Sequence, residues 1–337
     1  MNESANPLNN DAIIHLNKQV AESSNVQDHR PDLEVMIGRI RMRNPVMTAS
    51  GTFGFGEEYA AFYSLSRLGA ICVKGTTLHP RQGNPPPRIH ETPAGMLNSI
   101  GLQNPGVDEV ITEKLPFLRD KDVPIIVNIS GETIDEFVEV ARRLDAADGV
   151  AGLEINISCP NVAAGGRCFG MDPRLTYDVV HAVRRVTDLT LISKLSPNVT
   201  DIVEIARASV EAGADALSLI NTVLGAAFDI RRRKPVLDRV VGGLSGPAVK
   251  PIALAAIWQV ANAMDTPIVG MGGILTASDA IEFFLAGATA VAVGTANFVT
   301  PTAAIEVVDG IERYLSDAGM TSIRQLIRGC VPPCSLR

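Results

Sequence analysis

The chain has 337 residues, 46% of them hydrophobic but only 4% aromatic, and its formal net charge is −7 at pH 7. This length fits one large α/β barrel or two smaller domains, and the core must be built from aliphatic side chains. The acidic balance argues against a nucleic-acid partner, and five cysteines in a chain of this length do not form a secreted disulfide framework.

Residues 1–32 are polar and rich in Asn, Ser and Asp, so we predict a flexible N-terminal extension. Its one apolar cluster, Ala12-Ile13-Ile14, is too short for the hydrophobic region of a signal peptide. No run in the chain approaches the roughly 20 apolar residues of a membrane span. We expect a cytoplasmic protein with no membrane partner, and a targeting role for the extension is the alternative.

Residues 33–44 alternate apolar and polar side chains around Gly38, which predicts a β-hairpin ahead of the main fold. Eight short apolar segments then recur at similar distances, and each predicts a strand. The predicted strands are Pro45–Ala49, Ala70–Val73, Pro124–Ile129, Gly152–Ile157, Leu191–Leu195, Ala216–Ile220, Pro267–Gly270 and Ala290–Val293.

Helical patterns separate most of these segments. Residues 133–145 begin with a capping box formed by Thr133 and Glu136 and continue with apolar side chains at helical spacing. Residues 202–210 and 276–286 repeat that spacing, and a glycine follows each of them.

Strand–helix alternation repeated eight times predicts an α/β fold, a (β/α)8 TIM barrel over residues 33–318, with residues 319–337 as a C-terminal tail. A doubly wound sheet is the alternative, but no Gly-x-Gly-x-x-Gly follows the first strand. Two connections, residues 74–122 and 221–247, are too long for turns. Both start at carboxyl ends of strands, so we expect them to cover the active rim. The second carries the basic run 231–234, whose simplest interpretation is a solvated loop face.

The segment Gly152–Asn161 is an apolar strand that must stop at Pro160, because proline cannot extend a central ladder. The thiol of Cys159 is therefore expected at the carboxyl tip of a strand, between Asn156 and Asn161. In parallel α/β proteins catalysis takes place at this rim. A buried structural cysteine beside a turn is the alternative; the two carboxamides and the glycine-rich loop that follows favour a catalytic role.

Polar or glycine residues occur at all eight predicted strand ends, which predicts a pocket where those ends converge. In chain order they are Thr48, Ser50 and Gly51; Lys74, Gly75 and Thr76; Asn128; Asn156, Ser158 and Cys159; Lys194; Asn221 and Thr222; Gly270, Gly272 and Gly273; and Gly294 and Thr295.

The last two strand ends favour a phosphate site, because glycine lets backbone amides approach an anion and helix N-termini follow. A tight turn is the alternative for Gly272-Gly273 alone. Lys74 and Lys194 end apolar strands, so each needs an anionic partner. That partner is either a ligand anion or a carboxylate distant in sequence.

Four asparagines, Asn98, Asn156, Asn161 and Asn221, form a neutral hydrogen-bonding set. Carboxamides both donate and accept, which suits a planar ring with alternating C=O and N–H groups. No histidine falls at a strand end, so a histidine base is not expected. The cysteine pairs 159/168 and 330/334 do not resemble a four-ligand metal motif, and no metal site is predicted.

From the hairpin near Leu33 to about Phe298, the chain resembles the dihydroorotate dehydrogenase family. The resemblance is carried by these motifs, in order: Thr48-Ala-Ser-Gly51, Lys74-Gly75, Asn98-Ser-Ile-Gly-Leu-Gln-Asn104, Asn156-Ile-Ser-Cys-Pro-Asn161, Lys194-Leu-Ser-Pro-Asn198, Ile220-Asn-Thr222, Gly242-Gly-Leu-Ser-Gly-Pro-Ala248, Gly270-Met-Gly-Gly273 and Val293-Gly-Thr295.

The resemblance implies an FMN-containing barrel that oxidises (S)-dihydroorotate to orotate in pyrimidine (UMP) synthesis. It implies that Cys159 is the base for the C5 proton and that FMN accepts the C6 hydride. The residues implied to hold FMN are Ser50, Lys74, Gly75, Asn128, Asn156, Lys194, Ile220, Gly246, Gly272, Gly273, Gly294 and Thr295. Those implied to hold the substrate are Lys74, Asn98, Ser99, Ile100, Gly101, Leu102, Asn156, Asn161, Asn221 and Thr222.

A Cys base resembles the soluble class 1 enzymes; the membrane-bound, quinone-using branch carries Ser. Residues 161–170, 242–246 and 292–298 resemble the NAD-linked type, class 1B. That type implies a homodimer core joined to a subunit carrying FAD and an iron–sulfur cluster, a heterotetramer. The chain has no pyridine-nucleotide motif and too few clustered cysteines for such a cluster, which agrees with a partner supplying both.

Three alternatives to the NAD-linked subunit stay open. One is a self-sufficient, fumarate-using homodimer, and another is a non-catalytic FMN-binding barrel. An FMN barrel acting on tRNA uridines is disfavoured by the net charge of −7.

Overall fold

The structure, a computed structural model, describes residues 30–158 and 169–330. Eight parallel strands lie in the order β3-β16-β15-β10-β9-β8-β7-β4, and a parallel bridge between Met47 and Ala70 joins the two ends of this order, so the sheet closes into a barrel. The bounds are β3 (Val46–Thr48), β4 (Ile71–Thr76), β7 (Ile125–Ile129), β8 (Val150–Asn156), β9 (Thr190–Lys194), β10 (Ala216–Leu219), β15 (Ile268–Met271) and β16 (Ala290–Val293). These are the eight predicted segments, so the predicted (β/α)8 barrel is confirmed and the doubly wound alternative is wrong.

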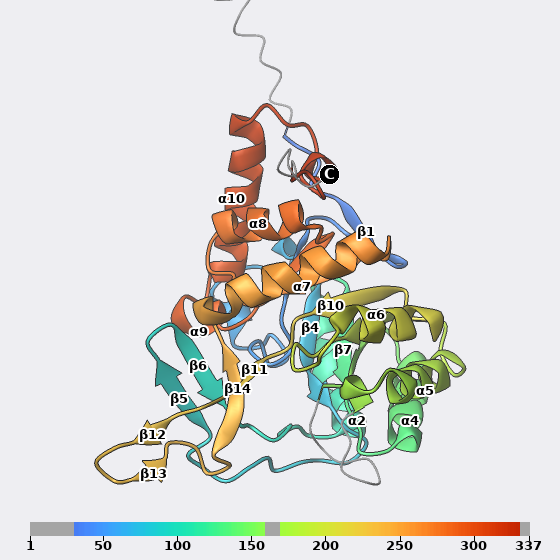
Figure 1. The fold of residues 1–337 in the computed structure, drawn as a ribbon. Coiled ribbons are helices and arrows are strands. Elements are labelled where there is room, and N and C mark those ends of the chain that lie inside the picture. Colours follow the sequence, from blue (N-terminus) through green and yellow to red (C-terminus); the bar gives the residue numbers. More distant parts are fainter. Residues whose placement is uncertain (1–29, 159–168, 331–337) are drawn as a thin grey trace, which may run out of the picture.

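Helices cover the outside of the barrel (Figure 1). The long ones are α4 (Ile134–Asp145), α5 (Pro173–Arg184), α6 (Ile202–Glu211), α7 (Lys250–Ala263), α8 (Ala277–Ala286) and α10 (Ala303–Asp317). Each contacts the next around the ring. The shorter ones are η1 (Tyr59–Ala61), η2 (Leu65–Arg67), α2 (Val107–Glu109), the π-helical η3 (Val110–Lys114), α3 (Leu115–Arg119), η4 (Phe169–Met171), η5 (Pro247–Val249), α9 (Ala296–Val299) and η6 (Ile323–Gln325).

The predicted helix starts follow the capping chemistry in the sequence. Thr133 Oγ1 accepts from the backbone N–H of Glu136, as predicted for α4, although the Glu136 carboxylate accepts from Glu132 N and not from Thr133 N. At α8 the capping box of Thr276 and Asp279 is complete in both directions. Both helices pack an apolar face on the strands, which are buried along almost their whole length.

The N-terminal hairpin, β1 (Val35–Ile37) and β2 (Ile40–Met42), is antiparallel as predicted. Gly38 turns it at φ +56°, and a Cβ there would lie 2.6 Å from Thr190 Cγ2 at the start of β9. The hairpin therefore closes the amino end of the barrel, opposite the predicted active rim. Beyond α10, Ile323 and Leu326 are buried in the main core. The division of the chain at residues 32 and 318 stays a prediction.

The two long connections form one antiparallel sheet, which we call the cap sheet, ordered β11-β14-β6-β5. Strands β5 (Ile89–Thr92) and β6 (Gly95–Asn98) come from the first connection, and β11 (Val223–Ala226) and β14 (Val241–Ser245) from the second. β14 pairs with β6, so segments far apart in sequence lie side by side (Figure 1).

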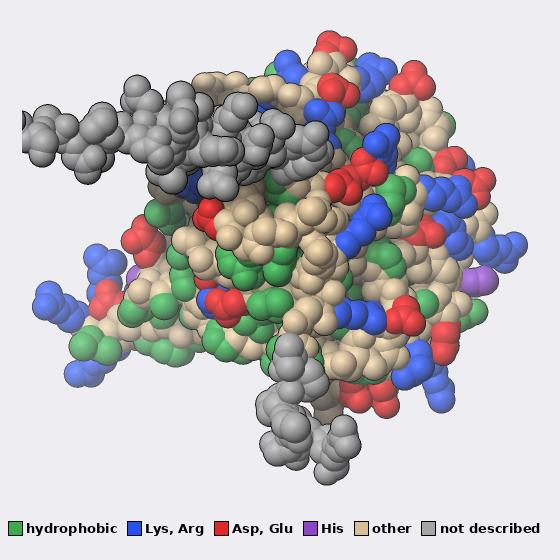
Figure 2. Space-filling view, turned by 90° about the horizontal axis from the view of Figure 1, so that it is seen from above, with side chains coloured by type: hydrophobic (Ala, Val, Ile, Leu, Met, Phe, Trp, Pro, Cys, Tyr) green, Lys and Arg blue, Asp and Glu red, His purple; other side chains and the backbone are tan. Residues whose placement is uncertain are grey.

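The basic run lies on a small hairpin, β12 (Phe228–Asp229) with β13 (Lys234–Pro235), that projects from the cap sheet. Arg231, Arg232, Arg233 and Lys234 are all exposed, as expected for a solvated loop face. Figure 2 shows Lys and Arg side chains gathered at the left end of the molecule, where this hairpin lies in Figure 1, whereas both charge signs mix over the rest of that face.

Candidate active site

A buried carboxylate lies inside the barrel near the carboxyl ends of the strands. Glu154 on β8 is 1% exposed, and four side chains from four other strands donate to it. Its Oε1 accepts from Asn128 Nδ2 (2.6 Å), Lys194 Nζ (3.2 Å) and Cys72 Sγ (3.4 Å), and its Oε2 accepts from Ser218 Oγ (2.9 Å). Because side chains alternate along a strand, Glu154 and Asn156 point to the same, inner side of β8.

Lys194 therefore has a protein carboxylate as its partner. Of the two alternatives that the sequence left open for this lysine, the structure shows the carboxylate distant in sequence. Lys194 Nζ also lies 3.3 Å from Ser50 Oγ at the end of β3, and both residues are buried. Three predicted cofactor residues, Asn128, Lys194 and Ser50, are thus joined to Glu154 in one hydrogen-bonded group.

The electrostatics of this group follow from its burial. Burial alone raises the pKa of the Glu154 carboxyl, but the Lys194 ammonium and the hydrogen bonds from Asn128 and Ser218 hold that pKa below its ordinary value. Burial, together with the adjacent carboxylate, raises the pKa of the Cys72 thiol well above its ordinary value. Cys72 is therefore a protonated donor to Glu154 and not a nucleophile.

Gly75, near the end of β4, lies directly against the buried oxygen of Asn128. Asn128 is 1% exposed, and its Oδ1 receives no hydrogen bond from the part of the chain that the structure describes. A Cβ on Gly75 would lie 2.9 Å from that oxygen and 3.6 Å from Leu102 Cδ2. Asn128, Gly75 and Leu102 therefore meet at one point of the rim.

Lys74, beside Gly75, is half-buried. Its side chain has no ion pair or hydrogen bond within residues 30–158 and 169–330. Burial, and secondarily the Arg88 guanidinium, lowers the pKa of Lys74. Unlike Lys194, Lys74 has no described carboxylate partner.

The predicted phosphate cradle is assembled from three segments. Gly272 (φ +123°) and Gly273 (φ +81°) follow β15, and a Cβ on Gly273 would lie 3.0 Å from Gly246 O and 2.8 Å from Lys250 Cβ. Thr295 Oγ1, after β16, donates to Ser245 Oγ at 2.8 Å. Among the described residues, no acceptor takes the backbone N–H groups of Gly272, Gly273, Gly294 or Thr295. Several free donors therefore collect where anions commonly bind in such barrels.

The described asparagines of the predicted substrate set lie at the ends of β8, β10 and β6. Asn221 Nδ2 lies 3.3 Å from Asn156 Oδ1. On the cap sheet, Asn98 Nδ2 donates to Gly243 O at 3.2 Å, and Gly243 packs directly against Thr222. The cap sheet thus brings Asn98 and Thr222 together from the two long connections.

The segment Ser99–Leu102 follows β6. Ser99 N donates to Arg88 O at 2.8 Å, whereas its buried Oγ has no described partner. Gly101 and Leu102 both have positive φ, and Asn84 lies against Gly101, so this segment has a fixed, tight conformation. Ile100 O accepts from Asn84 N at 2.9 Å.

The described residues of the predicted site lie together at one rim of the barrel. Ile220 is among them, because it packs against Gly272: a Cβ on Gly272 would lie 3.5 Å from Ile220 Cγ1. Cys159 and Asn161 lie outside the described residues. Sequence reasoning gave no role to Glu154, Cys72 or Ser218. The one available signal was an acidic residue inside an apolar strand, two positions before Asn156 and thus on the same face.

Asn198 also received no role from the sequence. Its Nδ2 donates to Thr222 O at 3.0 Å, and its Oδ1 accepts from Leu224 N at 3.0 Å. This carboxamide therefore fixes the entry into β11 beside the predicted substrate residues.

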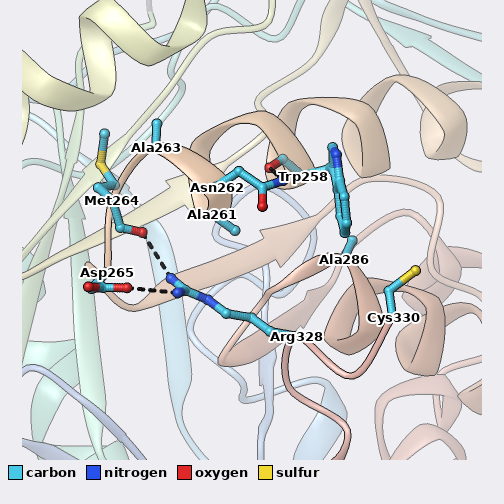
Figure 3. A pocket seen from close by; sticks show the side chains of 9 residues that line it. All are labelled: Trp258, Ala261, Asn262, Ala263, Met264, Asp265, Ala286, Arg328 and Cys330. Carbon is cyan, nitrogen blue, oxygen red and sulfur yellow. Dashed lines mark hydrogen bonds and ion pairs between the residues drawn. The ribbon is translucent and has the colours of Figure 1, made fainter. Parts of the chain in front are cut away.

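A separate cavity of about 400 Å³ lies at the opposite end of the barrel, lined by the carboxyl end of α7, by Ala286 of α8 and by Arg328 and Cys330 (Figure 3). Figure 3 shows Arg328 extended towards the loop after α7, where it bonds Asp265 Oδ1 (2.7 Å) and Met264 O (2.9 Å). Its cation is already paired, and no predicted site residue lines this cavity.

Within residues 30–158 and 169–330, no cluster of three or more His, Cys, Asp or Glu side chains is arranged to bind a metal ion. No described helix combines the length and apolar character needed to cross a bilayer.

The chain is similar to known proteins over most of its length. The family model described as dihydroorotate dehydrogenase matches residues 32–315. A protein of Geotalea uraniireducens (strain Rf4), named dihydroorotate dehydrogenase B (NAD(+)), catalytic subunit, is 57% identical over 298 residues, which cover 88% of this chain and 98% of that protein. A protein of the same name from Desulforamulus reducens is 59% identical over 296 residues, covering 88% and 97%.

A solved structure supports the same fold. The crystal structure of DHODH in complex with ferulenol from Eimeria tenella aligns with a TM-score of 0.74 over 95% of both chains, at 24% identity. At that identity the likeness concerns the fold alone. The family model covers most of the chain and the relatives exceed half identity, so the chain belongs to the dihydroorotate dehydrogenase family.

Proposed function

We propose that this chain is the catalytic subunit of an NAD-linked dihydroorotate dehydrogenase, which oxidises (S)-dihydroorotate to orotate in de novo pyrimidine synthesis. Family membership and the shared name of the relatives support the reaction. The observation that carries the proposal is the meeting, at one rim, of a cradle of free backbone donors and a paired set of carboxamides.

The described residues fit FMN. The free N–H groups of Gly272, Gly273, Gly294 and Thr295 suit a phosphate, and the unpaired Asn128 Oδ1 behind Gly75 suits a ring N–H. When bound, FMN supplies a two-electron acceptor for the hydride that leaves the substrate. The residues that would hold it are Ser50, Lys74, Gly75, Asn128, Asn156, Lys194, Ile220, Gly246, Gly272, Gly273, Gly294 and Thr295.

The substrate would be held by a neutral amide set and one cation. Asn156, Asn161 and Asn221 both donate and accept, which suits the alternating C=O and N–H groups of the dihydroorotate ring. Asn98 to Leu102 and Thr222 would complete the set from the cap sheet. Lys74, without a described carboxylate partner, would pair with the substrate carboxylate or lie near the flavin.

Cys159 would remove the C5 proton as the general base. The conjugate base of a thiol is the proton acceptor, and a free thiol has a pKa of about 8.5. Cys72 does not suit this role, because burial beside Glu154 keeps its thiol protonated. The proton would leave from C5 to the Cys159 sulfur, while the hydride leaves from C6.

Electrons would pass to NAD through a partner subunit carrying FAD and an iron–sulfur cluster, in a cytoplasmic heterotetramer around a homodimer of this chain. The name of the relatives, a catalytic subunit of an NAD-linked enzyme, supports a separate electron-transfer subunit. The sequence of this chain contains no dinucleotide fingerprint. A fumarate-using homodimer is the second candidate.

The test is an acceptor panel on the purified chain, alone and co-purified with its native partner. We expect a yellow protein whose flavin is bleached by dihydroorotate without oxygen, with NAD reduction only when the partner is present. A folded but colourless protein that ignores added FMN would refute the flavin site. Efficient NAD reduction by the chain alone would refute the two-subunit arrangement, and fast turnover with fumarate would support the homodimer.

A further inference from the structure

We propose that Glu154 is a positioning residue for the flavin: it holds Lys194 and Asn128 in place and offsets the lysine charge, and so sets the reduction potential of the bound cofactor. This inference rests on the FMN site proposed above. It concerns a residue that lies behind the predicted cofactor contacts and belongs to none of them.

Hydrogen-bond geometry first fixes the orientation of Asn128. A carboxylate only accepts, so the Asn128 group 2.6 Å from Glu154 Oε1 must be the donor, Nδ2. The carboxamide oxygen is therefore forced to the other side, where it faces Gly75 without a described partner. Glu154 thus fixes which end of Asn128 the cofactor pocket receives.

The second step is the charge of Lys194. Its Nζ lies 3.2 Å from Glu154 Oε1 and 3.3 Å from Ser50 Oγ, with the lysine 6% and the glutamate 1% exposed. At such burial, water screens the pair weakly, and the carboxylate cancels much of the field that the ammonium projects into the pocket. The electric field at the flavin is therefore that of a nearly neutral ion pair and not that of an isolated cation.

The third step is the effect on the cofactor. Two-electron reduction leaves negative charge on the flavin, and fixed charges nearby favour or oppose it. Glu154 opposes it twice, by direct repulsion and by occupying Lys194. Removing only the charge of Glu154 should therefore make reduction more favourable and raise the potential.

Glu154→Gln is the variant that isolates this effect. The amide has the shape of the carboxylate: its oxygen can accept from Lys194 and Asn128, and its nitrogen can donate to Ser218 Oγ. The matched control keeps the charge and its position: Ser218→Ala removes only a neutral donor from the other oxygen.

The measurement is the FMN potential, from reductive titration against reference dyes, with flavin content read from the visible spectrum. For Glu154→Gln we expect the equilibrium constant for reduction to rise at least ten-fold, which corresponds to about 30 mV for a two-electron couple. Ser218→Ala should stay close to the parent potential. A Glu154→Gln protein that binds FMN at the parent potential overturns the inference.

A second comparison covers the case in which Glu154→Gln does not fold. Lys194→Met can be compared with the double variant Glu154→Gln/Lys194→Met, in which no buried cation is left uncompensated. Because the buried Glu154 of Lys194→Met has lost its cation and takes up a proton near neutral pH, the potentials are compared over a pH series. The double variant should have the higher potential where that carboxylate is ionised, and equal potentials at every pH would overturn the inference. If the parent chain itself binds no FMN, the proposed function is wrong. If the parent binds FMN but the variants have its reduction potential, only the role of Glu154 is refuted.

Discussion

The chemistry of single residues in this barrel depends on what each strand places beside it. Cys72 and Cys330 show this for one residue type. Cys72 is buried and donates to a carboxylate, so burial keeps it protonated, whereas Cys330 is exposed at the opposite end of the barrel. Neither has the surroundings of a base at the rim, and Cys159, which the sequence predicts at a strand end, stays the proposed base.

Substituting Cys159 tests the base directly. Cys159→Ala should retain FMN and orotate binding but reduce its flavin with dihydroorotate about 100-fold or more slowly, the usual contribution of a general base. In the parent the rate should rise with pH as the thiolate forms. Cys159→Ser should keep slight activity that rises only at higher pH, because a hydroxyl is a weaker acid. Stopped-flow flavin reduction against pH is the measurement.

Cys330→Ala is the control for that substitution. It removes a thiol that lies away from the rim, so its rate should equal that of the parent. A Cys159→Ala protein that reduces its flavin as fast as Cys330→Ala would place the base elsewhere.

Strand-end residues could be predicted one by one, because each follows an apolar run and a polar side chain there is unusual. Their mutual contacts could not. Lys194 and Glu154 are 40 positions apart, and nothing local links them. Only barrel order, which makes β8 and β9 neighbours, turns a glutamate inside an apolar strand into the partner of that lysine.

At the scale of an element, the turn after β15 shows how a backbone conformation builds a binding surface. Gly273 combines a positive φ with a crowded neighbourhood: a Cβ would press on Lys250 Cβ and Gly246 O. Gly319, after α10, also has a positive φ (+66°), but nothing lies within 4 Å of its Cβ position. Alanine at either position would strain the backbone, but only alanine at Gly273 would also crowd the cradle, so comparing the two variants distinguishes these effects.

We therefore expect Gly273→Ala to weaken FMN binding at least ten-fold, because the added methyl group displaces the loop whose N–H groups are free. Gly319→Ala should carry a similar backbone cost, about 1 kcal/mol in the free energy of unfolding, and leave FMN affinity unchanged. Fluorescence titration of the apoprotein with FMN, beside urea unfolding, measures both. Equal FMN affinity in the two variants would remove Gly273 from the phosphate site.

The type of an element and the residue at which it begins could be predicted where they depend on nearby residues in the sequence. Helical spacing and capping residues gave α4, α6 and α8, and apolar runs gave the eight strands. The strands within the long connections were missed. β11 and β14 contain glycines, and every residue in them except Gly242 is exposed or half-buried, so they lack the alternation of buried and exposed side chains that marks a strand.

At the scale of the whole molecule, the cap sheet couples the two long connections. Gly243 of β14 lies opposite Asn98 of β6, although 145 positions separate them in sequence. We expect the amides of β6 and β14 to exchange with solvent together, because opening one strand breaks the ladder of the other. The small hairpin β12–β13 pairs only with itself and is exposed, so its amides should exchange earliest.

Hydrogen–deuterium exchange followed by peptide mass spectrometry makes this measurable, with the β12–β13 peptide as the internal control. If β14 exchanged as fast as that hairpin while β6 stayed protected, the two connections would open independently. Such pairing could not be read from the sequence, because register between distant segments depends on the closed barrel that brings them together.

The cap sheet also constrains how this enzyme can be redesigned. A connection borrowed from a relative would normally be exchanged alone, as a self-contained graft. Here residues 75–105 and 221–247 behave as one cassette: Gly95 and Gly246 approach so closely that a Cβ on Gly246 would lie 2.7 Å from Gly95 Cα. In a chimaera that exchanges only one of the two segments, the paired strands of the cap sheet would come from different proteins and would not fit each other beside the substrate residues. To change substrate specificity at this rim, both segments should therefore be exchanged together.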